Sequence, residues 1–200
     1  MICSFNLNQI QESVEDDLTG LGMFLQQLIG EPFLFFRESY GGELTLHFGV
    51  SKERKYPKLK NRVRGSYVLT VRGSFWMMIA VEKGTVVLSD APRGMSAAEL
   101  KKLSAIDIEK SPPVRPGSLL LWVLPHADEF SGGIGLALGF SDQTRFIIRP
   151  EPPYSEDVNS DDEDLPEIAD WEMYTPLGRY LTVGPGQKWA YLPSTMEDKK

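Results

Sequence analysis

Residues 117–151 read GSLLLWVLPHADEFSGGIGLALGFSDQTRFIIRPE, and this stretch decides the fold class. Its apolar runs are separated by short segments rich in Gly, Ser and Asp, a pattern typical of consecutive strands joined by tight turns. Large and small side chains alternate over 134–140, as on a strand with two different faces. The run at 117–125 is almost entirely apolar, so we expect a strand that is buried on both faces.

Strand patterns continue on both sides of this stretch. PFLFFRES at 32–39 and ELTLHFGV at 43–50 predict a hairpin, and further strands follow in the sequence. Two helices are predicted, at 7–29 and 96–109, because apolar residues recur there at spacings of three and four. Because strands outnumber helices and do not alternate with them, we predict an α+β fold. It would contain a predominantly antiparallel β-sheet of about eight to ten short strands.

The length and composition favour one globular domain with an appendage. The chain has 200 residues, of which 42% are hydrophobic and 24% charged, values that exclude collagen-like, fully disordered and membrane-spanning chains. A main domain is predicted at 1–150, an acidic and irregular segment at 151–172, and C-terminal strands that pack back on the main domain at 173–200. The one cysteine, Cys3, excludes an intrachain disulfide and favours the cytoplasm as location.

The net charge of −7 hides a separation of charge along the chain. Residues 151–172 hold ten acidic side chains and no Lys or Arg, which leaves 18 acidic against 21 basic residues elsewhere. Residues 52–64 hold seven basic side chains and one acidic side chain. These two segments either meet within one molecule or each binds a partner, because charge asymmetry is evidence about association rather than about fold. The candidate binding residues are Arg54, Lys55, Lys58, Lys60, Arg62 and Arg64.

Aromatic residues are frequent towards the C-terminus, and two interpretations are open for them. They could anchor a protein interface, in which large aromatic side chains are enriched. They could also pin the last strands onto the body of the protein, and we favour this second interpretation. The residues concerned are Trp171, Tyr174, Tyr180, Trp189 and Tyr191.

Familiar catalytic motifs are missing from the sequence. It contains no nucleophile elbow, no HExxH, no CxxC and no phosphate-binding loop. His47 falls on a polar strand face that could be exposed to solvent, and His126 follows the apolar run beside Asp128 and Glu129. Two imidazoles and a carboxylate would suffice for a catalytic metal if these residues met. The sequence itself predicts neither a metal site nor a cofactor.

Three functions follow from these observations. The first is a non-enzymatic interaction protein that recognises another protein through charged surfaces, as an immunity or regulatory protein does. The second is a metal-assisted hydrolase that uses His47 and His126 with Asp128 or Glu129. The third is a protein that binds nucleic acid or another anionic ligand through residues 52–64, although the isoelectric point near 5.0 argues against a dedicated nucleic-acid binder. We favour the first function, and we do not expect a membrane to be a partner.

Overall fold

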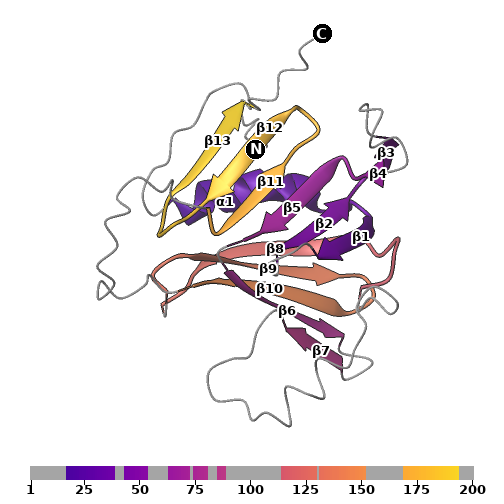
Figure 1. Ribbon diagram of the computed structural model, residues 1–200, viewed down its shortest axis with the longest axis horizontal. Coiled ribbons are helices and arrows are strands. Elements are labelled where there is room, and N and C mark those ends of the chain that lie inside the picture. Colours follow the sequence, from indigo (N-terminus) through magenta and orange to yellow (C-terminus); the bar gives the residue numbers. More distant parts are fainter. Residues whose placement is uncertain are drawn as a thin grey trace, which may run out of the picture.

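The protein folds into two large antiparallel sheets with a short helix beside them (Figure 1). A computed structural model describes residues 17–38, 43–53, 63–72, 74–80, 85–88, 114–129, 131–151 and 169–193. These residues form a six-stranded, a five-stranded and a two-stranded sheet, which together hold more strands than the eight to ten predicted. The predominantly antiparallel architecture is confirmed.

The six-stranded sheet joins the beginning and the end of the described chain. Its strand order is β1-β2-β5-β11-β12-β13, and the predicted hairpin at 32–50 is its β1–β2 pair. The last three strands thus add to the sheet through the pairing of β11 with β5. The strands are β1 (Phe33–Glu38), β2 (Leu44–Phe48), β5 (Tyr67–Val71), β11 (Trp171–Tyr174), β12 (Arg179–Val183) and β13 (Trp189–Pro193).

The five-stranded sheet contains most of residues 117–151, as β8, β9 and β10. Its order is β7-β6-β10-β9-β8, so the run at 117–125 falls in a strand at the edge of the sheet. The expectation that this strand is buried on both faces is wrong, because Leu121 and Leu124 are more than half exposed. The strands are β6 (Ser74–Ala80), β7 (Thr85–Leu88), β8 (Leu120–Ala127), β9 (Ile134–Phe140) and β10 (Thr144–Pro150).

The prediction of two helices is not confirmed. One α-helix is described, α1 (Leu18–Leu25), followed by the 3₁₀ turn η1 (Gln26–Leu28), and both fall within the predicted helix at 7–29. Asp17 caps it by accepting a hydrogen bond of 2.7 Å from the backbone N–H of Gly20, and this cap defines where the described helix begins. Residues 7–16 and the predicted helix at 96–109 lie outside the described residues. No helix in the described ranges is long and apolar enough to cross a membrane.

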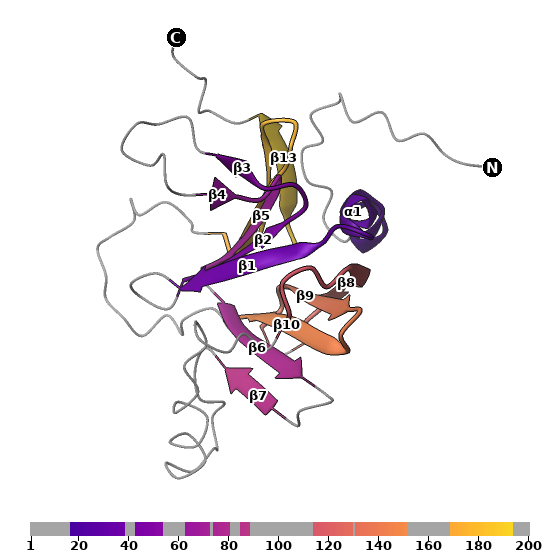
Figure 2. The ribbon, with the colours of Figure 1, turned by 90° about the vertical axis from the view of Figure 1, so that its right-hand side faces the viewer.

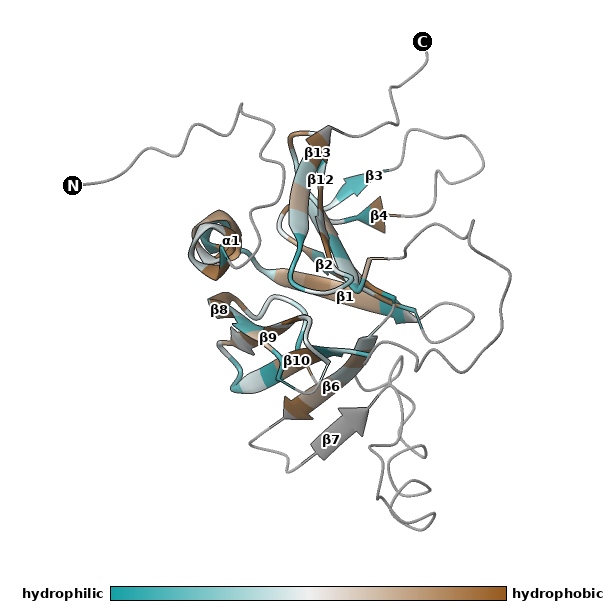
Figure 3. Cartoon of the chain, turned by 90° about the vertical axis from the view of Figure 1, so that its left-hand side faces the viewer, coloured by the Kyte–Doolittle hydropathy of each residue, from teal (hydrophilic) through white to brown (hydrophobic). Residues whose placement is uncertain are grey.

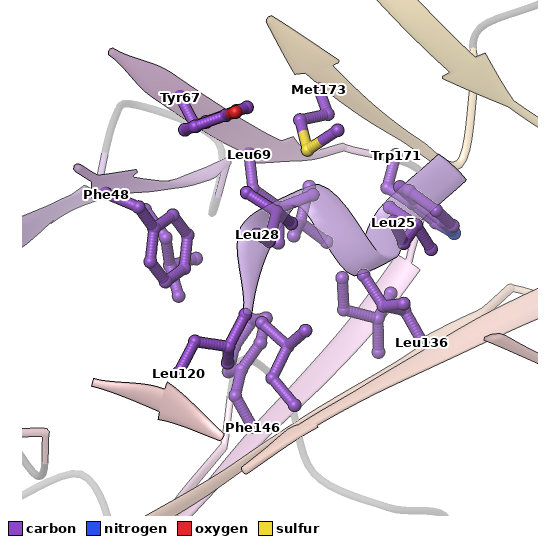
Figure 4. Close-up of a cluster of buried hydrophobic side chains, with 14 of the residues drawn as sticks. Leu25, Leu28, Phe48, Tyr67, Leu69, Leu120, Leu136, Phe146, Trp171 and Met173 are labelled. Atoms are coloured by element: carbon purple, nitrogen blue, oxygen red, sulfur yellow. The ribbon is translucent and has the colours of Figure 1, made fainter. Parts of the chain in front are cut away.

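A single hydrophobic core lies between the two sheets and α1 (Figures 2 and 4). The helix contributes Leu25, and η1 contributes Leu28. The sheets contribute alternate residues of their inner faces, as the period of two along a strand requires. Fully buried examples are Phe48, Leu69 and Met173 of the six-stranded sheet and Leu120, Leu136 and Phe146 of the five-stranded sheet.

A short hairpin stands on the other side of the six-stranded sheet from α1 (Figure 3). It pairs β3 (Lys52–Glu53) with β4 (Val63–Arg64), so both ends of the basic segment 52–64 are fixed. The hairpin touches β1, because Arg37 Nη2 donates a hydrogen bond of 3.4 Å to the carbonyl oxygen of Val63. The two ends of the basic segment, β3 and β4, are therefore fixed beside the outer face of the six-stranded sheet.

Candidate functional site: the outer face of the six-stranded sheet

The structure places His47 inside the protein rather than at a solvent-exposed face. The imidazole is 1% exposed and stacks on Phe35, with 4.3 Å between the ring centroids. Its Nδ1 accepts a hydrogen bond of 3.2 Å from the backbone N–H of Gly65, which links β4 to β5. His47 therefore supports the base of the β3–β4 hairpin.

His126 lies in the other sheet, on β8. It pairs with Gly135 of β9, and a Cβ atom at Gly135 would lie 2.5 Å from its Nε2. The missing side chain of Gly135 is what makes room for the imidazole ring. In the described part of the chain, no three His, Cys, Asp or Glu side chains are grouped so that they could hold a metal ion.

Asp128 holds the turn between β8 and β9. It is 6% exposed, accepts hydrogen bonds from the backbone and side chain of Ser131, and forms an ion pair of 2.9 Å with Arg149. Burial alone would raise the pKa of Asp128, but the hydrogen bonds from Ser131 and Arg149 outweigh it and hold the pKa below its usual range. The neighbouring Glu129 is exposed. No observation among these residues favours the hydrolase hypothesis.

Of the six basic residues proposed for binding, Arg64 is described in detail. Arg54, Lys55, Lys58, Lys60 and Arg62 lie outside the described residues. The Arg64 guanidinium lies over the ring of Tyr174 on β11, 3.9 Å from the ring centroid.

Tyr174 belongs to a row of side chains that crosses the outer face of the sheet. The cross-strand register brings together Phe35, His47, Val68, Tyr174 and Tyr180, one from each of five neighbouring strands. Tyr174 and Tyr180 meet edge to face, with 5.2 Å between their ring centroids. The outer face therefore carries an aromatic row at its middle.

A second, polar row runs beside the aromatic one. Thr45, Thr70 and Glu172 are cross-strand neighbours on β2, β5 and β11. Arg72, next to this row, forms ion pairs with Glu43 at 2.8 Å and with Glu172 at 3.6 Å. Its positive charge is therefore shared between two carboxylates.

The two rows and Arg64 of the hairpin border a small, open hollow of about 220 Å³. Arg64, Tyr174 and Tyr180 line it together with the two threonines and the Arg72–Glu172 pair. Burial, and then the neighbouring Tyr174, raise the pKa of Tyr180. The phenol therefore remains a neutral hydrogen-bond donor at neutral pH.

Two arginines on this face are stacked on aromatic rings without a carboxylate partner. Arg64 lies over Tyr174, and Arg37 lies 5.0 Å from the ring centroid of Phe35. Neither forms an ion pair with a carboxylate among the residues that the structure describes. The rings and the hairpin thus position both guanidinium groups, and no carboxylate of the described residues compensates their charges.

The C-terminal aromatics divide between the core and the outer face of the six-stranded sheet. Trp171, Trp189 and Tyr191 are at most 3% exposed and belong to the core, whereas Tyr174 and Tyr180 lie on the outer face. Alternation along β11 separates Trp171 from Tyr174, and this was a readable signal in the sequence. The position of Tyr174 and Tyr180 beside Arg64 depends on the pairing of β11 with β5, and no local sequence pattern predicts that pairing.

No family model matches the chain, and no curated protein and no solved structure matches it significantly.

Proposed function

We propose that this chain is a non-enzymatic interaction protein that recognises another protein through the outer face of its six-stranded sheet. The observation that carries the proposal is a pair of arginine–aromatic contacts, Arg37 with Phe35 and Arg64 with Tyr174, in which neither arginine has a carboxylate partner among the described residues. Arginine and tyrosine are the residue types that most often dominate binding energy at protein interfaces. Such a protein would act as an immunity or regulatory protein does, in the cytoplasm.

The charge of the surroundings supports an acidic partner surface. The strands of the β3–β4 hairpin are the two ends of the segment 52–64. The side chains of this segment sum to a net charge of +6. Basic residues of this kind steer an oppositely charged partner into place and act mainly on the association rate. The aromatic stacks hold the guanidinium groups in fixed positions, which reduces the entropy lost on binding.

The test is a comparison of two charge-reversed proteins. The double variant Arg37→Glu/Arg64→Glu changes the proposed face, and Arg145→Glu/Lys188→Glu makes the same change in net charge at exposed positions of β10 and the β12–β13 turn. Proteins that co-purify with the wild-type chain from its own cells are identified, and the strongest is purified and titrated against all three chains. We expect the control to bind within threefold of wild type and the face variant at least 100-fold more weakly.

Equal binding by the two double variants would refute the use of this face. Specific retention of nucleic acid in place of protein, with an affinity that falls steeply with salt, would favour the third function instead.

A further inference from the structure

Arg64 contacts an aromatic ring and donates no hydrogen bond to a carboxylate of the described residues. Its guanidinium carbon lies 3.9 Å from the ring centroid of Tyr174, and the N–H groups of an arginine, five in number, lie in the plane of the guanidinium. Stacking and in-plane hydrogen bonding are compatible, which is why arginine serves where a planar anion must be recognised. The Arg64 side chain is thus prepared for an anionic group that approaches from the edge of the guanidinium.

The size of the hollow beside Arg64 limits what can enter. Its volume of about 220 Å³ is below the range of about 300–1,000 Å³ that is typical of pockets for drug-sized ligands and cofactors. Three residues that carry hydroxyl groups, Thr45, Thr70 and Tyr180, are among those that line it. A space of this size and polarity suits one side chain of another molecule.

The described surroundings of the hollow favour a carboxylate over nucleic acid. Base stacking requires free aromatic faces, but Arg64 covers one face of Tyr174, and Phe35 is stacked on His47. Glu43 and Glu172 stand beside the hollow, where they would repel a continuous phosphate backbone. A single carboxylate can reach Arg64 while Arg72 continues to compensate these two residues.

We infer that the hollow receives an Asp or Glu side chain from an acidic surface of the partner protein, held by Arg64 and the surrounding hydroxyl groups. This inference rests on the proposed function and adds the chemical identity of the recognised group. One competing source of carboxylates is the chain itself, which carries seven acidic residues between positions 156 and 167.

The experiment uses the full-length chain and two labelled peptides, octaglutamate and octaglutamine, in fluorescence anisotropy titrations at low salt. The variants are Arg64→Gln, which removes the charge, and Arg64→Lys, which keeps the charge but loses the planar fork. Arg145→Gln is the control for a distant exposed arginine, and Lys58→Gln is the control for diffuse attraction by the basic segment. Thermal unfolding of each variant verifies that it is folded.

We expect octaglutamate to bind at least tenfold more tightly than octaglutamine. Arg64→Gln should weaken octaglutamate binding by about tenfold and Arg64→Lys by about threefold to fivefold, as expected for a charge-assisted, oriented hydrogen-bond pair. Arg145→Gln should change the affinity by less than threefold, and Lys58→Gln should weaken binding clearly less than Arg64→Gln does.

Equal losses in Arg64→Gln and Lys58→Gln would overturn the inference in favour of diffuse electrostatic attraction. So would tighter, Arg64-dependent binding of a 15-nucleotide oligothymidylate than of octaglutamate. A rise of tenfold or more in octaglutamate affinity when the seven acidic residues at 156–167 are changed to amides would assign the hollow to the chain's own acidic segment. If Arg37→Glu/Arg64→Glu abolishes binding of the partner protein but the wild-type chain binds octaglutamate no more tightly than octaglutamine, this inference fails while the proposed function stands.

Discussion

Two buried aspartates show how neighbours decide the protonation of a residue. Asp128 and Asp170 are 6% and 7% exposed, so burial disfavours the charged form of both. Asp128 is compensated by Arg149 and Ser131. Asp170 has an Oδ2 without a hydrogen-bond partner among the described residues, and burial together with the negative charge of Glu151 raises its pKa to about 7.

Replacing Asp170 by Asn should stabilise the protein at alkaline pH. Because the folded pKa of about 7 exceeds the ordinary value of 3.8, the folded state binds a proton more tightly than the unfolded state. The free energy of unfolding therefore falls as the pH rises from about 4 to 7 and levels off above that range. We expect Asp170→Asn to exceed wild type by about 2–4 kcal/mol at pH 8 and to match it near pH 4. Urea unfolding followed by tryptophan fluorescence measures both differences.

The matched variant Asp128→Asn should behave in the opposite way. Its pKa is lowered in the folded state, so the charged form contributes stability above pH 3.8 that is lost as the pH falls further. We expect a loss of about 1–2 kcal/mol at pH 7, since Arg149 remains half exposed. A stabilised Asp128→Asn chain at pH 7 would contradict this account.

At the scale of elements, the β3–β4 hairpin depends on one glycine. Gly65 lies between β4 and β5, where a Cβ atom would collide with the carbonyl oxygen of Phe48 and lie 2.7 Å from its nitrogen. These are backbone atoms of β2, which cannot move aside without breaking the sheet. Gly65 thereby sets how closely the hairpin that carries Arg64 approaches the sheet.

Gly65→Ala should destabilise the protein by about 2–3 kcal/mol, the cost of forced overpacking. It should also weaken partner binding as strongly as loss of Arg64, because Arg64 is displaced from Tyr174. Gly22→Ala is the matched control, since its Cβ would make an ordinary contact of 3.7 Å with Pro125. Alanine is the better helix former, so Gly22→Ala should stabilise α1 by up to about 1 kcal/mol. Chemical denaturation compares the two, and equal effects would refute the proposed role of Gly65.

Local patterns predicted some of these elements and missed others for a physical reason. The β1–β2 hairpin was predictable because its alternating residues and its turn are contiguous in the sequence. The edge position of β8 was not predictable. An apolar run gives the same sequence pattern in a central strand and in an edge strand that packs beside a helix. The site required the pairing of Trp171 with Val71, which lie 100 positions apart. Arg64 was a predicted binding residue, but its contact with Tyr174 follows from that distant pairing.

At the scale of the whole molecule, a buried indole joins the two sheets. Trp171 of β11 is fully buried and donates a hydrogen bond of 2.9 Å from Nε1 to the carbonyl oxygen of Ile134 on β9. Trp189 is buried to a similar degree, but its Nε1 has no partner among the described residues. A comparison of these two tryptophans therefore separates the contribution of the indole hydrogen bond to stability from the contribution of burial.

We expect Trp171→Phe to lower the free energy of unfolding by about 1–3 kcal/mol more than Trp189→Phe. The first variant leaves a buried carbonyl oxygen without its donor, whereas the second removes a donor that was already unsatisfied. Both should unfold in one transition, because one core spans both sheets and α1. Equilibrium denaturation measures both quantities, and equal losses would show that the inter-sheet bond adds nothing to burial.

The order of the six-stranded sheet also has a consequence for how the chain is made. During synthesis, β5 leaves the ribosome about a hundred residues before β11, its neighbour in the finished sheet. A nascent chain therefore holds Arg64 and the basic segment but not Tyr174 and Tyr180. Chains synthesise at roughly 5–20 residues per second, so β5 waits for several seconds with one edge unpaired. The outer face is thus complete only in chains in which β11 and β12 have already been synthesised.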